Sequence, residues 1–340
     1  MNEYLDILEN WSASKKSVAI ARVIKTWGSS PRPVGSVMLV NESGEMAGSV
    51  SGGCVEVAVV KKATEVMDGG TSIKLAYGVS DEDAWSVGLS CGGSIQVFVE
   101  TIDFESLVWR QLLENIKSNK SSILVSSLED GGKKTSLISE DGQLAGAEIS
   151  EELRSAALQA YDERTHKTIT IGDTEYFIQL FPRKAQLLVI GAAHITVDLV
   201  SLANEFGFET IVIDPRSYFA EKTTFQDPPD QIHNVYPSEV LNDFALDAYT
   251  FAAILSHDPK IDDNALEILL PSKTAYIGAL GSRKTHAKRT ARLLEKGIPQ
   301  ELIDKIKAPI GVNINARSAK EIALAIMAQI IEAKNANLIR

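Results

Sequence analysis

Several features that mark specialised classes of protein are scarce in this sequence. Its 340 residues include only two cysteines and no cluster of Cys and His, which argues against a structural zinc site. No apolar run approaches the roughly 18 residues that cross a membrane. Acidic residues outnumber basic ones by 45 to 34, and the formal charge is −11, so a nucleic-acid backbone is not the expected partner.

The opening residues also lack the pattern of an export signal. They read M-N-E-Y-L-D-I-L-E, which is acidic and amphipathic rather than basic and then apolar. No long internal repeat and no low-complexity tract is visible. We therefore expect a cytoplasmic protein whose cysteines are kept in a reducing environment.

The remaining composition is that of a globular α/β protein with two domains. Hydrophobic residues make up 44% and charged residues 23% of the 340 positions, enough for two cores. Strand patterns, hairpin turns and a helix predict a mixed α+β domain over 1–105. A helix and a further hairpin fill 106–183, which we expect to continue that domain. Strands and helices alternate over 184–340, as in a Rossmann-like, doubly wound parallel sheet.

The most informative stretch is the run of small residues at 48–56, G-S-V-S-G-G-C-V-E. It leads to Cys54, where an apolar-periodic helix begins. Backbone amides at a helix N-terminus have no partner within the helix and can bind an anion, and the helix dipole favours a thiolate there. The run therefore predicts a loop that holds an anionic ligand against a reactive sulfur. A tight turn around a buried, inert cysteine is the alternative.

The second cysteine, Cys91, lies in a similar turn. Residues 88–99 read G-L-S-C-G-G-S-I-Q-V-F-V, so Gly92 and Gly93 follow the thiol and lead into a strand. Each cysteine thus lies beside a Gly-Gly pair, which chance does not readily explain. A disulfide between the two is a rival explanation, weakened by the expected reducing environment.

A βαβ pattern opens the C-terminal block. The buried-strand pattern Q-L-L-V-I is followed by G-A-A-H-I-T, a helix over 197–206 and the strand E-T-I-V-I, which is the length of half a Rossmann fold. Asp214 ends the second strand, where such folds bind a ribose hydroxyl. The fingerprint G-x-G-x-x-G is incomplete, because Ala193 and Thr196 occupy its second and third glycine positions. The sequence thus gives only partial support to NAD(P) binding.

The carboxyl ends of the expected parallel strands carry many polar residues, and open α/β sheets bind ligands at that edge. The residues expected in this pocket are Gly191, Ala193, His194, Asp214, Arg216, His257, Asp258, Gly281, Arg283 and His286. The set predicts a polar site, most simply for a phosphate-bearing molecule. Three of the five histidines belong to it, so a three-histidine metal site is the alternative.

The order of these motifs along the chain resembles that of the XdhC/CoxI family of xanthine dehydrogenase accessory proteins. The N-terminal part of the resemblance is G-S-V-S-G-G-C-V-E and G-L-S-C-G-G-S-I-Q-V-F-V-E. The C-terminal part is V-I-G-A-A-H, V-I-D-P-R, L-S-H-D-P-K-I-D, Y-I-G-A-L-G-S-R-K-T-H and A-P-I-G-V-N-I-N-A-R-S-A-K-E. One departure is G-A-A-H, where the family usually has G-x-G-H.

The resemblance implies a role in the late handling of the molybdenum cofactor, molybdopterin. Family members bind the mature cofactor, cooperate with a cysteine desulfurase that installs its sulfido ligand, and deliver it to an apo molybdenum hydroxylase such as xanthine dehydrogenase. By motif position Cys54 would contact the molybdenum, since a thiolate suits a soft metal centre. The other residues expected at the cofactor site are Ser51, Gly52, Gly53, Glu56, Cys91, Gly92 and Gly93. We expect a homodimeric chaperone rather than an enzyme.

Two other functions remain open. The Rossmann block could belong to a nicotinamide-dependent oxidoreductase, which would use His194 and Asp214 but leave both cysteine turns without a role. It could instead be part of a non-catalytic scaffold and serve only to dimerise or to dock the target enzyme.

Overall fold

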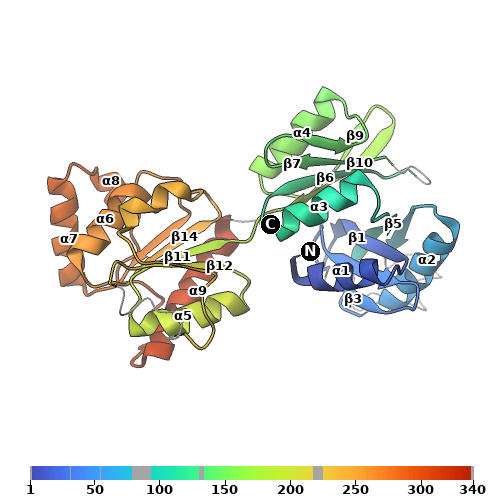
Figure 1. Ribbon diagram of the computed structural model, residues 1–340. Helices are drawn as coiled ribbons and strands as arrows, with labels where there is room; N and C mark the ends of the chain where they lie inside the picture. The colour runs from blue at the N-terminus through green and yellow to red at the C-terminus, as the bar shows by residue number, and fades with distance from the viewer. Residues whose placement is uncertain are drawn as a thin grey trace. The chain divides into compact units, whose positions relative to one another are not determined.

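The computed structural model describes residues 2–30, 32–53, 55–78, 93–129, 134–216 and 225–337 (Figure 1). Cys54, Cys91 and Gly92 lie outside the described residues. The chain divides into two compact units, the first including Met1–Arg183 and the second Lys184–Leu338. None of the described helices is long and apolar enough to span a membrane.

The first unit contains two five-stranded antiparallel sheets, ordered β3-β2-β1-β5-β4 and β8-β7-β6-β10-β9. The first half consists of α1 (Leu5–Ala13), β1 (Val18–Trp27), β2 (Val37–Asn41), β3 (Met46–Gly48), α2 (Glu56–Gly69), β4 (Ile73–Tyr77) and β5 (Ser94–Ile102). The second half consists of α3 (Leu107–Lys117), β6 (Ser122–Ser127), β7 (Thr135–Ser139), β8 (Leu144–Gly146), α4 (Glu151–Asp162), β9 (Lys167–Ile171) and β10 (Thr174–Phe181). The strands and hairpins predicted from the sequence in this part are confirmed.

Side chains of β1 alternate between two hydrophobic cores, because successive residues of a strand point to opposite faces. Ala19 and Ala21 pack against α2, which covers one face of the first sheet. Val18 and Ile20 pack on the other face with α1, α3 and residues of the second sheet. The helix α4 covers the remaining face of the second sheet. The two sheets therefore share one core, and α2 and α4 lie on the outer faces.

The two halves of this unit form an internal repeat, so the expectation of no long repeat is wrong. Each half has three consecutive strands, a helix and two more strands, placed in the same order in its sheet. With the strands aligned, L-V-N-E-S-G-E-M-A-G ending at Gly48 matches L-I-S-E-D-G-Q-L-A-G ending at Gly146. Both glycines have positive φ, +85° and +95°, and an added Cβ would lie 2.3 Å and 2.4 Å from the carbonyl oxygens of Val37 and Thr135. The same steric constraint acts at both positions.

The second unit contains a parallel sheet ordered β13-β12-β11-β14-β15. Its elements are β11 (Gln186–Ile190), α5 (His194–Glu205), β12 (Glu209–Ile213), β13 (Gln231–His233), β14 (Thr250–Ile254), α6 (Pro259–Leu269), β15 (Tyr276–Ala279), α7 (Arg283–Glu295), α8 (Gln300–Ile303) and α9 (Ala319–Asn337). The strand order reverses between β11 and β14, which is the switch point of a Rossmann-like fold. The predicted fold class is confirmed.

Helices cover both faces of this sheet (Figure 1). Leu187 and Val189 belong to the core with α5 and α9, whereas Leu188 and Ile190 belong to the core with α6, α7 and α8. A capping box begins α9: the amide of Ser318 donates to the Glu321 carboxylate at 2.9 Å, and the Glu321 amide donates to the Ser318 hydroxyl at 3.3 Å.

Candidate functional site

The loop between β3 and α2 is organised around the carboxylate of Glu56. Its Oε1 accepts hydrogen bonds from the Ser49 hydroxyl at 2.6 Å and the Ser51 amide at 2.9 Å. Its Oε2 accepts from the Ser51 hydroxyl and from the amides of Gly53 and Val55, the last two at 2.9 Å and 3.2 Å. Glu56 is only 8% exposed, so the loop encloses a negative charge.

The surroundings of Glu56 keep its side chain ionised. Burial alone would raise the pKa of this carboxyl, but the hydrogen bonds from Ser49, Ser51 and the backbone outweigh burial and lower the pKa from 4.5 to about 2. The carboxylate also lies in the first turn of α2, where the helix dipole favours negative charge. Glu56 is therefore ionised at neutral pH.

The amides that were expected to bind an external anion are used within the chain. The amides of Ser51, Gly53 and Val55 donate to Glu56, and the amide of Gly52 donates to the Ser49 hydroxyl at 2.9 Å. The anion at this helix start is thus the chain's own carboxylate. Gly53 is exposed, and a Cβ built there would meet no atom of the described residues within 4 Å, its two chain neighbours aside. The loop therefore presents open backbone immediately before Cys54.

The equivalent loop in the second half shows how few residues this helix start requires. Only residues 147–150, four in all, separate β8 from α4, and the Ser150 hydroxyl caps the helix by accepting from the Leu153 amide at 3.2 Å. Residues 49–55, seven in all, separate β3 from α2. The loop before α2 is longer than its counterpart and is ordered by a buried carboxylate. Because the shorter loop is enough to begin a helix, the longer one is a candidate functional site.

Of the second cysteine turn, only Gly93 is described. It is buried beside the end of β1, where an added Cβ would lie 2.4 Å from the carbonyl oxygen of Ser29 and 2.9 Å from that of Trp27. Close packing against this backbone explains why the position is occupied by glycine. Whether Cys91 and Gly92 belong to the same site as Cys54 stays a prediction.

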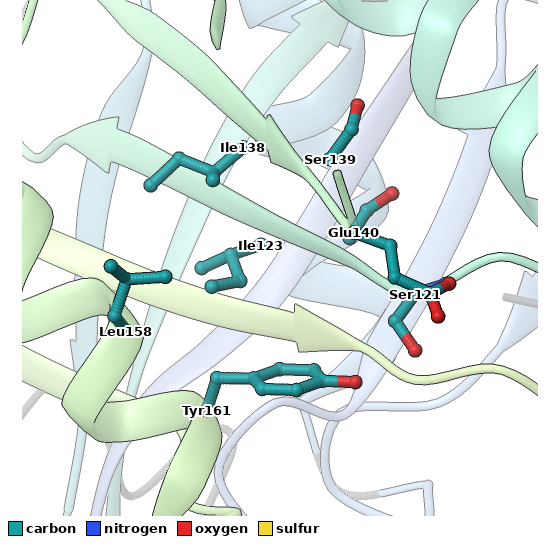
Figure 2. Close-up of a pocket in the computed structure, with 8 residues that line it drawn as sticks. Ser121, Ile123, Ile138, Ser139, Glu140, Leu158 and Tyr161 are labelled. Carbon is teal, nitrogen blue, oxygen red and sulfur yellow. The ribbon is translucent and has the colours of Figure 1, made fainter. Parts of the chain in front are cut away.

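The first unit also has a small pocket between the second sheet and α4 (Figure 2). Ile123, Ile138 and Leu158 lie at one end of it, and the oxygen atoms of Ser139 and Glu140 lie at the other. Its volume is about 70 Å³, the space of about two water molecules. It is too small for a pterin cofactor.

In the second unit, the carboxylate of Asp214 is hydrogen-bonded to the loop that follows β11. It is fully buried and accepts from the Ala192 amide at 2.7 Å. It also accepts from the amide and Nε of Arg216, both at 2.9 Å, and from Nη2 at 2.7 Å. Burial would raise the pKa of Asp214, but these hydrogen bonds lower it overall. The carboxylate that was expected to bind a ribose hydroxyl is thus engaged within the chain.

Local contacts account for Gly191 and Thr196 in this segment. An added Cβ on Gly191 would lie 2.5 Å from backbone atoms of Ser256, which follows β14, so a side chain does not fit at this position. The buried Thr196 hydroxyl donates to the Gly191 carbonyl at 2.6 Å. With Ala193 as its N-cap, α5 begins at His194, three residues before the predicted start.

The parallel strand order brings the predicted pocket residues to one sheet edge but not into one cluster. The Asp258 carboxylate caps α6 by accepting from the Lys260 amide at 2.9 Å. His286 is half-buried, and burial followed by the charge of Arg289 lowers its pKa. Among the described residues, no group of three or more His, Cys, Asp or Glu side chains could hold a metal ion. The three-histidine alternative is therefore unsupported in the described part of the chain.

A cavity of about 420 Å³ lies at this edge, between α6 and α7. It is lined by His257, Pro259, Asp262, Leu280, Lys284, Thr285, Lys288, Arg289 and Arg292. Of the predicted pocket residues, only His257 is among them. The four cations of α7 that line the cavity were not predicted from the sequence, although three of them recur every fourth residue, the spacing of one helix face.

Comparison with known proteins places both units in one family. The family model of the XdhC Rossmann domain matches residues 187–330, and the model of the XdhC and CoxI family matches residues 11–78. A Bacillus subtilis protein, named as a probable subunit of xanthine dehydrogenase, is 27% identical over 98% of both chains. The Escherichia coli molybdenum cofactor insertion chaperone PaoD is 25% identical over 93% of this chain and 83% of its own.

A solved structure extends the match to the whole fold. A Bacillus halodurans protein described as a xanthine dehydrogenase superposes with a TM-score of 0.75 and 30% identity, covering 98% of this chain and 96% of its own. The resemblance inferred from the motifs is thereby confirmed. With a family model matched in each unit and a solved relative matched almost end to end, this chain belongs to the XdhC and CoxI family.

Proposed function

We propose that this protein binds the molybdenum cofactor and delivers it to a molybdenum hydroxylase of the xanthine dehydrogenase type. One relative is named a molybdenum cofactor insertion chaperone, and two others are named after xanthine dehydrogenase. The observation that carries the proposal is the elaborated loop before α2, which is longer than its counterpart before α4 and is ordered by Glu56.

The loop has the properties of a holding site for a metal-bearing cargo. Glu56 fixes the backbone on both sides of Cys54, through the amides of Gly53 and Val55. The backbone at Gly52 and Gly53 is exposed, so a ligand can approach it. A thiolate from Cys54 would be a soft ligand for molybdenum. One protein ligand, rather than a closed set, suits a cargo that must be released to the hydroxylase.

The geometry of the second unit favours this proposal over an NAD(P)-dependent oxidoreductase. Asp214 is bound to Arg216 and to the Ala192 amide instead of being open to a ribose. Ala193 and Thr196 replace the glycines that allow a pyrophosphate to approach. We expect no oxidation of NADH or NADPH by the purified protein.

Cofactor binding is the first test. The purified protein is incubated with molybdenum cofactor released from a molybdenum enzyme and then separated by gel filtration. Molybdenum is measured by mass spectrometry and the pterin by fluorescence after oxidation. Co-elution of both with the protein is expected. If neither elutes with the folded protein, the proposal fails.

The proposal includes two partners and a homodimer. A cysteine desulfurase would supply the terminal sulfido ligand while the cofactor is held, and the apo hydroxylase would receive the product. Adding the loaded protein to apo xanthine dehydrogenase should restore activity faster than free cofactor does, and preincubation with the desulfurase and cysteine should increase the final activity. Light scattering measures the oligomeric state. Equal activation with and without the protein would contradict delivery.

A further inference from the structure

The cavity between α6 and α7 has a wall of positive charge. Lys284, Lys288 and Arg292 follow one another at four-residue spacing along α7 and all line it. Arg292 makes a bidentate ion pair with Asp263, at 2.6 Å and 2.9 Å. Both lysines are exposed, and neither forms an ion pair with a described residue. Two cationic groups at the cavity thus have no counter-charge in the described part of the chain.

A buried arginine at the same cavity has unused hydrogen-bond donors. Arg289 is 2% exposed, and its Nη2 donates to the Asp262 carboxylate at 3.1 Å and to the Leu280 carbonyl at 3.0 Å. Its Nε and Nη1 are buried and have no hydrogen-bond partner among the described residues. Leaving charged donors buried and unpaired costs free energy. An acceptor brought into the cavity would reduce that cost.

The carboxylates near the cavity do not cancel this charge. Asp262 accepts a hydrogen bond from the Ser256 hydroxyl at 2.6 Å and forms an ion pair with Arg289. Asp263 forms an ion pair with Arg292. Asp258 caps α6 through the Lys260 amide. None of these three carboxylates forms an ion pair with Lys284 or Lys288.

We propose that this cavity binds the phosphate group of a small molecule, a phosphate monoester. Such a group carries a charge of about −1.5 to −2 and three acceptor oxygens, which matches two uncompensated lysines and a guanidinium with unused donors. The volume of about 420 Å³ lies within the roughly 300–1,000 Å³ of small-molecule sites. The ligand would thus extend beyond its phosphate. This inference does not depend on the proposed cofactor-handling role.

Binding is measured by titration calorimetry at low ionic strength with inorganic phosphate, cytidine monophosphate, phosphate-free cytidine and a pterin phosphate. The variant Lys284→Gln/Lys288→Gln removes the uncompensated charge and leaves Arg289 in place, because removing that buried arginine would strand the Asp262 carboxylate. Lys273→Gln is the matched control. Lys273 is exposed and precedes β15, so it lies at the amino-terminal end of that strand, away from the cavity.

The wild-type protein should bind the phosphate-bearing probes and not cytidine. The double variant should bind about tenfold more weakly or worse, the Lys273→Gln protein should bind normally, and added salt should weaken binding. Tighter binding of the pterin phosphate than of cytidine monophosphate would identify the pterin as the source of the phosphate, and the reverse order would identify a nucleotide. Absence of binding by the wild type, or equal binding by the double variant, would overturn the inference.

Discussion

Replacing Glu56 with glutamine should loosen the loop before α2 and destabilise the first unit. Glutamine preserves the length of the side chain but turns one acceptor oxygen into a donor. The hydroxyls of Ser49 and Ser51 and the amides of Gly53 and Val55 all point at this carboxylate. Some of these donors would then be left buried without an acceptor, which is the costly outcome.

The size of the effect follows from the pKa of Glu56, which falls from 4.5 to about 2 in the folded protein. At about 1.4 kcal/mol for each pKa unit, the charged form contributes about 3 kcal/mol, and partial access of water reduces the expected loss to about 2 kcal/mol. Because the folded-state pKa is the lower one, this contribution is fully present above about pH 4.5 and is lost as the pH falls toward 2.

Tryptophan fluorescence during urea unfolding measures this loss for the first unit alone. All four tryptophans, Trp11, Trp27, Trp85 and Trp109, belong to the first 183 residues. The matched control is Glu65→Gln on the same helix, whose carboxylate pairs with Lys62 in an exposed ion pair, a kind of pair that adds little to stability because solvent screens it.

The Glu56→Gln protein should have the lower urea midpoint near pH 7, and its difference from the wild type should shrink near pH 3. Equal midpoints for Glu56→Gln and Glu65→Gln near pH 7 would refute the view that the carboxylate orders the loop.

Three further predictions concern other parts of the chain. Gly146→Ala should destabilise the first unit by about 2 kcal/mol or more in the same fluorescence assay. The loss should exceed that of Gly142→Ala, whose Cβ would meet only the end of an arginine side chain at 3.6 Å. Equal losses would contradict the steric argument. Asp214→Asn should speed amide hydrogen exchange in β11 and β12 of the second unit by removing a buried charge partner, and unchanged exchange would count against that role. Cys54 and Cys91 should both be found reduced when thiols are trapped in cell lysate, and a quantitative bridge would be inconsistent with the expected reducing environment.

Local patterns were sufficient to predict most strands and the Rossmann-like sheet. Alternation and turn residues mark the hairpin of β2 and β3, and the capping box marks the start of α9, because these signals depend only on neighbouring residues. The internal repeat was missed because its halves share topology more than sequence. The shared strand order makes the match visible, and the paired positions of Gly48 and Gly146, each against a strand carbonyl, agree with it.

The sequence predicted candidate sites at the loop before α2 and at the carboxyl ends of the parallel strands, and of the predicted pocket residues only His257 lines the cavity between α6 and α7. The sequence indicated the loop at 48–56 as a candidate site. It did not indicate that the Glu56 carboxylate accepts hydrogen bonds from the backbone amides of the loop, because those contacts depend on how the loop folds back on itself. The sequence also indicated Asp214 as a binding residue. The hydrogen bonds from Arg216 to its carboxylate depend on side-chain geometry, which the sequence alone does not give. The basic face of α7 follows from helical spacing, whereas the proposal of a ligand there rests on the buried donors of Arg289 that have no partner among the described residues.

The most direct test of cofactor binding at the loop before α2 is the amount of molybdenum retained by Cys54→Ser. Serine is nearly isosteric with cysteine, so the variant should unfold at the urea midpoint of the wild type. After incubation with molybdenum cofactor and gel filtration, it should retain much less molybdenum than the wild type. Undiminished molybdenum on a folded Cys54→Ser protein would contradict the assignment of this loop as the cofactor site.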